Sequence, residues 1–167
     1  MKKQNLSLSS LIVIIFFFLI SLFFFEQTPY VISGKAEVVD GDTIKINGTK
    51  IRLFGIDAPE LKQKCRKKSG ESYLCGEFSK GMLDFIESQD VTVRCEYSKK
   101  DKYGRILGIC FTPRKDLNKW MVQTGAAVAY KRYSKKYLAD EEYARDKKFG
   151  IWSGDFIRPE EWRKKNK

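Results

Sequence analysis

Apolar and polar residues alternate along four stretches of this chain, and the four stretches form two pairs. The pairs are 35–46 with 49–57, and 91–97 with 105–111. Asn47-Gly48 separates the first pair, and this dipeptide favours the type I′ turn of a β-hairpin. A turn at 101–104 separates the second pair. The pattern therefore predicts two antiparallel hairpins, and the run 126–130 indicates one more short strand.

Helical signals occur in three further stretches, which are 76–88, 116–125 and 138–150. The first has an apolar face that we expect to lie in the core, made of Phe78, Met82, Phe85 and Ile86. The second begins at a candidate N-cap, Asp116, and ends at Gly125, with a buried stripe of Leu117, Trp120 and Met121. The third has its acids first and its lysines last, as the helix dipole prefers.

Two stretches show no period. Residues 61–75 are rich in Lys and Arg, and we expect a long surface loop there. Residues 151–167 form a basic tail that we expect to dock on the domain through Trp152, Phe156 and Trp162.

The order of these elements limits the fold. A chain of 167 residues is long enough for one domain and a short appendage. Five or so short strands, three helices and no alternation of strand and helix predict an α+β domain on a small closed β-barrel.

The N-terminus has the pattern of an export signal. Lys2 and Lys3 precede an apolar run, 11–25, which only Ser21 interrupts. The run is between a signal-peptide core and a short membrane span in length, so both a cleaved signal and an uncleaved anchor are open. Cleavage after Ser33 would divide the chain into 1–33 and a domain of 34–167. Either alternative places the domain outside the cytoplasm, in the periplasm, in the medium or tethered to a membrane.

Composition narrows the partners and the chemistry. Lys and Arg number 32 against 21 Asp and Glu, so the formal charge is +11, which suits a polyanion such as nucleic acid. A basic surface that serves solubility or an acidic membrane face is the alternative. The sequence contains no histidine, which excludes every mechanism that uses an imidazole.

The cysteine count agrees with an exported protein. Cys65 and Cys75 flank the basic loop, and Cys95 and Cys110 lie almost symmetrically about the turn of the second hairpin. Two disulfides, Cys65–Cys75 and Cys95–Cys110, are therefore expected. A zinc site of four thiolates is the rival interpretation, although no C-x-x-C spacing supports it.

The first hairpin gathers charged residues. Asp40, Asp42, Asp57 and Glu60 lie in the stretch 40–60 together with Arg52. Such a cluster is tolerable around a divalent cation, and oxygen ligands without His or Cys select Ca²⁺, Mg²⁺ or Mn²⁺. Turn formation by Asp before Gly is the simpler alternative.

Three motifs in this order, VVDGDTIKI, IRLFGIDAPE and DKYGR, resemble the staphylococcal nuclease (thermonuclease) family from about Lys35 to Trp152, and the cysteines resemble those of exported bacterial members. The resemblance implies an OB-fold barrel of five strands with three helices. It also implies a monomeric calcium-dependent phosphodiesterase that cleaves DNA and RNA with little sequence preference.

The family's site residues fall on matching positions of this chain. The resemblance implies that Asp42, Asp57 and the backbone carbonyl of Ala58 bind calcium. It implies that Glu60 activates the attacking water, and it does not place Asp40 among the calcium ligands. Arg52 and Arg105 would stabilise the scissile phosphate. The positions expected to bind substrate are Lys102, Tyr103 and Tyr130. A non-catalytic OB module that binds nucleic acid and a membrane-tethered interaction domain are the alternatives.

Overall fold

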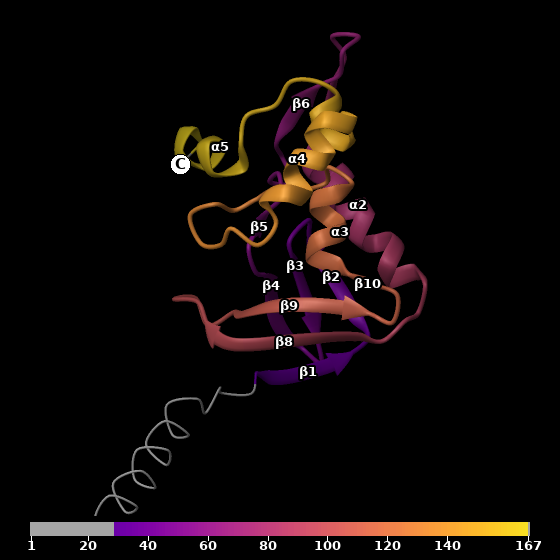
Figure 1. The fold of residues 1–167 in the computed structure, drawn as a ribbon, viewed down its shortest axis with the longest axis vertical. Helices are drawn as coiled ribbons and strands as arrows, with labels where there is room; N and C mark the ends of the chain where they lie inside the picture. The colour runs from indigo at the N-terminus through magenta and orange to yellow at the C-terminus, as the bar shows by residue number, and fades with distance from the viewer. Residues whose placement is uncertain (1–28, 167) are drawn as a thin grey trace, which may run out of the picture.

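The computed structural model describes residues 29–166, which combine one large β-sheet with four α-helices (Figure 1). The strands are β1 (Tyr30–Gly34), β2 (Ala36–Asp40), β3 (Thr43–Ile46), β4 (Thr49–Leu53), β5 (Ile56–Asp57), β6 (Lys64–Arg66), β7 (Ser72–Leu74), β8 (Val93–Lys100), β9 (Ile106–Thr112), β10 (Lys115–Asp116) and β11 (Val128–Ala129). The helices are α2 (Cys75–Ser88), α3 (Leu117–Gln123), α4 (Leu138–Lys147), the 3₁₀ turn η1 (Gly150–Ser153) and α5 (Pro159–Lys165).

The large sheet has seven strands and curls as a half-barrel. Its strand order is β1-β8-β9-β4-β3-β2, with β10 added beside β9. All pairs are antiparallel except β4 with β9, which is parallel. Figure 1 shows β8 and β9 running across the direction of β3 and β4. Two small sheets, β5 with β11 and β6 with β7, lie outside this path.

The α+β class is confirmed, whereas the predicted numbers of elements and the closed barrel are wrong. The sheet has seven strands instead of five, and its end strands β1 and β2 are not hydrogen-bonded to each other among the described residues. A fourth helix, α5, lies in the stretch expected to be a tail. The loop expected at 61–75 contains the β6–β7 hairpin, whose first strand also forms a bridge from Arg66 to Asp155. The β6–β7 pairing is local, whereas the bridge to Asp155 joins distant parts of the chain.

Local turn and cap signals are confirmed. Asn47 and Gly48 both have positive φ angles, 50° and 74°, as a type I′ turn requires. The side chain of Asp116 accepts a hydrogen bond of 2.9 Å from the backbone amide of Lys119, so it caps α3 as predicted. Gly125 follows α3 with a φ of 67°.

Alternate residues of the strands and one face of each helix form the core. In β9 the buried positions are Ile106, Gly108 and Cys110, which is the period of two expected for a strand. In α2 the buried apolar side chains are Cys75, Leu83 and Ile86. The predicted apolar face of α2 is wrong at one position, because Phe85 is 56% exposed.

Both predicted disulfides are present. Cys95 and Cys110 are register partners in β8 and β9, and Cys65 bonds Cys75 at the start of α2. Each sulfur is therefore bonded to another sulfur, and the four-thiolate zinc interpretation is wrong. The Cys65–Cys75 bridge lies in a small second core with Val128 and Ile151.

The expected signal or anchor falls mostly on residues 1–28, which lie outside the described residues. The strand β1 crosses the expected boundary after Ser33, because Tyr30–Gly34 pairs with β8 in register, Ile32 facing Cys95. A cut after Ser33 would remove four of the five residues of β1. Among the helices of the described residues, none has the length and apolar character of a membrane span.

Candidate active site

The site is built where β2 passes into β3 and where β5 ends. The β2–β3 ladder is irregular between Val38 and Asp40, and a bulge of this kind redirects the side chains that follow it. The carboxylate of Asp40 accepts a hydrogen bond of 3.0 Å from the backbone amide of Asp42 and so holds the turn. The Asp42 carbonyl accepts from the amide of Leu53 at 2.8 Å, which fixes the turn against β4.

Two buried carboxylates share this site. Asp42 is 3% exposed and Asp57 is 1% exposed. Arg52, from β4, donates to both: its Nη1 bonds Asp42 Oδ1, and its Nη2 lies 2.8 Å from Asp57 Oδ1. The backbone amide of Ala58 donates to Asp42 Oδ2 at 3.0 Å. The structure therefore brings together Asp42, Asp57, Ala58 and Arg52, four residues that the sequence placed in one site.

Burial and neighbouring charges shift the titration of this group. Burial raises the pKa of Asp40 to about 6, and the nearby charge of Asp42 adds to the rise. Burial also raises the pKa of Asp57, against the opposing ion pairs with Arg163 and Arg52. Burial alone would lower the pKa of Arg52, but Asp42 and Asp57 outweigh it and raise that pKa. Among the described residues, Asp40 makes no ion pair, and its carboxylate bonds the Asp42 amide instead.

Glu60 lies at the edge of the carboxylate pair, after the buried Pro59. Its side chain is 40% exposed, and its Oε1 accepts from Arg163 Nη1 at 2.9 Å. Gly76, in the first turn of α2, packs against the Glu60 backbone so closely that a methyl group there would overlap the Glu60 carbonyl oxygen. This close contact therefore fixes the position of the Glu60 backbone relative to α2.

A fully buried amide, Gln63, joins Glu60 to the C-terminal segment. Its Oε1 accepts from the Glu60 amide at 3.2 Å, and its Nε2 donates to the Ile157 carbonyl at 2.7 Å. The Gln63 backbone amide also donates to the Glu60 carbonyl at 2.7 Å, and its carbonyl accepts from the Cys75 amide at 3.0 Å. These four bonds tie the Glu60 loop to the first disulfide and to the chain that leads into α5.

Arg163, from α5, is a site residue that sequence reasoning missed, and it contacts the carboxylates directly. Its Nη1 and Nη2 each lie 3.0 Å from an oxygen of Asp57, and Nη1 also bonds Glu60. The pKa of Arg163 is raised: burial opposes the rise, and the bonds to Asp57 and Glu60 outweigh it. The only sequence signal for it was the basic character of the C-terminal stretch, which does not single out one residue.

The loop between β8 and β9 holds three more predicted residues away from the carboxylates. Arg105 is paired with Asp101, its Nε and Nη2 lying 2.8 and 2.7 Å from Asp101 Oδ2. Tyr103 is 71% exposed, and the Lys102 ammonium lies 4.9 Å from its ring centre. Arg105 lies 5.6 Å from the same ring. These residues share a cleft with Arg52 but do not touch its carboxylate partners.

That cleft, of about 790 Å³, is lined by every predicted side chain of the site except the buried Asp57. Tyr130 lines it too, with its ring 4.7 Å from that of Tyr133 in an edge-to-face contact. The further cationic residues of the lining, which the sequence did not single out, are Lys99, Lys100, Arg132 and Lys164. Exposed tyrosines among cations suit a flexible polyanion with aromatic bases.

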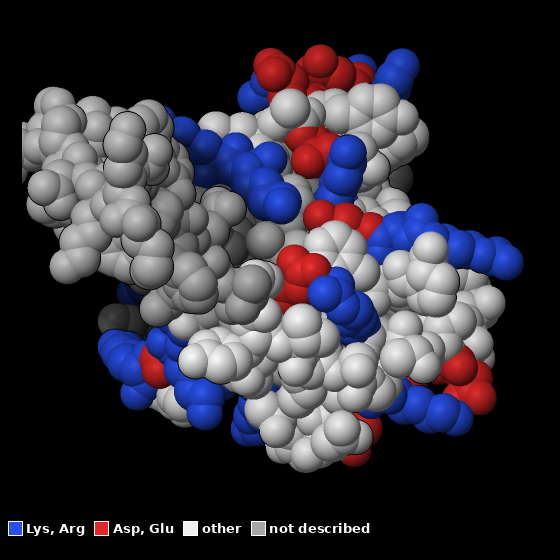
Figure 2. Space-filling view, turned by 60° about the horizontal axis from the view of Figure 1, so that its bottom comes forward, with Lys and Arg blue, Asp and Glu red and all other residues white. Residues whose placement is uncertain are grey.

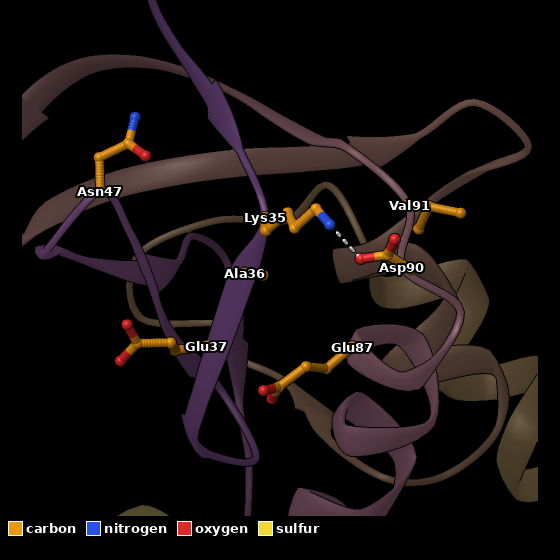
Figure 3. A pocket seen from close by; sticks show the side chains of 7 residues that line it. All are labelled: Lys35, Ala36, Glu37, Asn47, Glu87, Asp90 and Val91. Carbon is orange, nitrogen blue, oxygen red and sulfur yellow. Dashed lines mark ion pairs between the residues drawn. The ribbon is translucent and has the colours of Figure 1, made fainter.

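A second hollow, of about 590 Å³, lies between β2 and the end of α2 (Figure 3). An ion pair of 2.5 Å between Lys35 and Asp90 crosses it, and both side chains are about three quarters exposed. Glu87 points toward β2 and accepts from the Val38 amide at 2.9 Å. The charged side chains of this second hollow thus already have partners at the surface, where ion pairs contribute little. The cleft around Asp42 is therefore the better candidate for the active site.

Basic side chains do not form a single patch on the face that Figure 2 shows. Figure 2 shows one face of the molecule, on which Lys and Arg side chains lie at several separate places with Asp and Glu side chains between them. Within residues 29–166, no three His, Cys, Asp or Glu side chains converge in the manner of a metal centre. The carboxylate pair of Asp42 and Asp57 is balanced by guanidinium groups.

The chain matches the family described as Staphylococcal nuclease homologue over residues 50–154. The chain belongs to the staphylococcal nuclease family. Membership makes it a hydrolase of the nuclease type with an OB fold. The matched residues include Arg52, Asp57, Glu60 and Arg105, whereas Asp42 precedes them.

Relatives of this nuclease have several names. It is 40% identical over 123 residues to Succinoglycan biosynthesis protein ExoI of Rhizobium meliloti (strain 1021), a match that covers 72% of this chain and 64% of that protein. It is 36% identical over 134 residues to an Uncharacterized endonuclease of Escherichia coli, covering 75% of this chain and 80% of the relative. It is 32% identical over 149 residues to Micrococcal nuclease of Shigella flexneri, covering 78% and 79%.

Proposed function

We propose that this nuclease hydrolyses DNA and RNA with little sequence preference, with the help of a divalent cation, outside the cytoplasm. The observation behind the proposal is the buried pair of Asp42 and Asp57 beside a cleft that also contains Glu60 and Arg52. Two carboxylates at this depth need positive charge next to them, and the cleft is open to a large substrate.

The donor set fits a hard cation. The carboxylates of Asp42 and Asp57 and the carbonyl of Ala58 would hold calcium, with Mg²⁺ or Mn²⁺ as other oxygen-binding candidates. The guanidinium groups of Arg52 and Arg163 beside these carboxylates support a site for positive charge. When bound, such a cation supplies Lewis-acid stabilisation of the phosphate oxygens.

The chain's own residues supply the remaining chemistry. In the proposal Glu60 takes the proton of the attacking water, a role that falls to a carboxylate because the chain has no histidine. Arg52 lies beside both buried carboxylates and, with Arg105, stabilises the additional charge on the phosphate. Arg105 is paired with Asp101, and in the proposal it exchanges this partner for the substrate phosphate.

Substrate binding is assigned to the open side of the cleft. Lys102 would pair with a phosphate, and Tyr103 and Tyr130 would stack on bases. Stacking on an exposed ring does not distinguish one base from another, and this supports low sequence preference. Single-stranded or flexible regions give the rings access to bases, so we expect single-stranded DNA to be cleaved faster than duplex DNA. We expect the active protein to be a monomer.

Export is part of the proposal and depends on the N-terminal sequence. If Ser33 were the cleavage site, the mature protein would begin inside β1 and lose its pairing with β8. A cut before Tyr30, or an uncleaved anchor, would keep that strand. Mass spectrometry of the N-terminus of the protein isolated from its host distinguishes these three cases.

The catalytic assignment is tested by replacing Glu60. The full chain, purified in mild detergent, is incubated with single-stranded DNA, duplex DNA and RNA in the presence of calcium. Glu60→Gln should reduce the cleavage rate at least a hundredfold, in the range typical of general-base loss. Glu142→Gln, a matched change on the exposed surface of α4, should cleave like the parent. Equal rates for the Glu60 variant and the parent, or binding of DNA without cleavage by the parent, would contradict the proposal.

A further inference from the structure

The C-terminal helix α5 inserts one cation into the carboxylate pair. Arg163 forms a two-pronged contact with Asp57, both nitrogen–oxygen distances being 3.0 Å, and shares Nη1 with Glu60 at 2.9 Å. A planar guanidinium in this geometry forms stronger and more directional bonds than an ammonium group. One side chain thus contacts both a predicted metal ligand and the predicted water activator.

The placement of α5 does not depend on Arg163 alone. Arg158, just before the helix, bonds the buried Glu141 of α4 with an Nη2–Oε1 distance of 2.6 Å. Within the helix, Glu160 contacts Arg132 at 3.3 Å. Together with the bond from Gln63 to Ile157, these contacts hold the helix while the Arg163 side chain remains 31% exposed toward the cleft. The guanidinium can therefore move without release of α5.

The same oxygens serve two cations. A divalent ion held by Asp42 and Asp57 must use Asp57 oxygens, and Arg163 occupies both of them. A guanidinium next to a divalent ion is also repelled by it, and this repulsion is weakly screened at a buried carboxylate. Binding of the ion must therefore displace Arg163 or work against its charge.

We infer that Arg163 is a positioning residue of the nuclease site, which competes with the divalent cation for Asp57 and, once displaced, leaves Glu60 free to act on water. The inference rests on the proposed metal dependence. In this account the C-terminal helix sets the concentration of cation at which the site becomes active. The residue keeps Asp57 compensated and ordered when calcium is scarce.

Calcium titration by calorimetry tests the inference without a cleavage readout. The full chain in mild detergent is compared with Arg163→Gln, Arg163→Lys and Lys165→Gln, the last removing the same charge from an exposed position of α5. Arg163→Gln should bind calcium roughly tenfold more tightly or better, the equivalent of one displaced ion pair. Arg163→Lys should fall between that variant and the parent, and Lys165→Gln should match the parent.

A second readout covers stability. Without calcium, Arg163→Gln should melt at a lower temperature than the parent, because Asp57 loses one of its two guanidinium partners. Calcium should then raise its melting temperature by more than it raises that of the parent. Equal calcium affinity for the parent, Arg163→Gln and Arg163→Lys would overturn the inference and leave the metal proposal intact. Absence of binding by all four proteins would overturn both.

Discussion

Replacing Gln63 by Leu tests whether the buried amide holds the Glu60 loop and the C-terminal segment together. Leucine nearly preserves the volume and removes both side-chain bonds, to the Glu60 amide at 3.2 Å and to the Ile157 carbonyl at 2.7 Å. Both partner groups would be left without these bonds in the interior. Each such loss costs about 1–3 kcal/mol, and the longer bond belongs at the low end, so we expect about 3 kcal/mol in total.

The assay is urea unfolding of the full chain with its disulfides intact. With a slope of about 2 kcal/mol per molar urea, the midpoint should fall by about 1.5 M. Gln123→Leu is the matched control, since Gln123 is only half-buried and its amide makes one bond of 2.9 Å to Asp140. That variant should lose at most about 1 kcal/mol. Equal midpoints for the two variants would refute the claim that the Gln63 side chain holds the Glu60 loop and the C-terminal segment together.

Three further changes test other parts of the structure. Gly76→Ala should push the Glu60 loop away from α2 and reduce cleavage tenfold to a hundredfold, on the order expected for small misplacements, with unfolding measured in parallel; an unchanged rate would contradict the close contact. Asp116→Ala removes the α3 cap and also the acceptor of the buried Tyr137 hydroxyl, so it should cost about 2 kcal/mol in urea unfolding, and no loss would contradict the capping role. Burial would raise the pKa of Glu141, but the hydrogen bonds and the charge of Arg158 outweigh burial and lower that pKa. The contribution of ionised Glu141 to the free energy of unfolding is therefore complete above the ordinary carboxyl range, and it is lost as pH falls through the lowered pKa. The urea midpoint of the parent should therefore fall on acidification, and Glu141→Gln should start lower and fall less; parallel curves would contradict this.

Sequence reasoning predicted the features that depend on local chemistry. The turn at Asn47-Gly48 and the cap at Asp116 follow from conformations that these residues prefer by themselves. The hairpin that brings Cys95 opposite Cys110 follows from symmetry about its turn. Asp42, Asp57 and Arg52 meet because the β3–β4 hairpin and the short β5 follow one another in the chain.

The remaining features depend on contacts between distant segments. β1 is a strand because it pairs with β8, its partners lying from Gly34↔Val93 to Tyr30↔Tyr97, and its own sequence lies shortly after the apolar N-terminal run. Arg163 is 106 positions from Asp57 and has neighbours of the same charge, so no local pattern distinguishes it. Phe85 is exposed because the buried face of α2 is centred on Ser79 and Leu83. A face shifted by one residue is within the accuracy of a helical pattern without its packing partner.

Calcium dependence of cleavage is the most direct test of the central claim. The initial rate of single-stranded DNA cleavage by the full chain is measured against free calcium set by EGTA, for the parent and for Asp57→Asn. The account predicts a saturable rise for the parent, loss of activity in excess EGTA, recovery on adding calcium back, and little activity for the variant at any concentration. A parent rate that does not change between excess EGTA and saturating calcium, magnesium or manganese would contradict it.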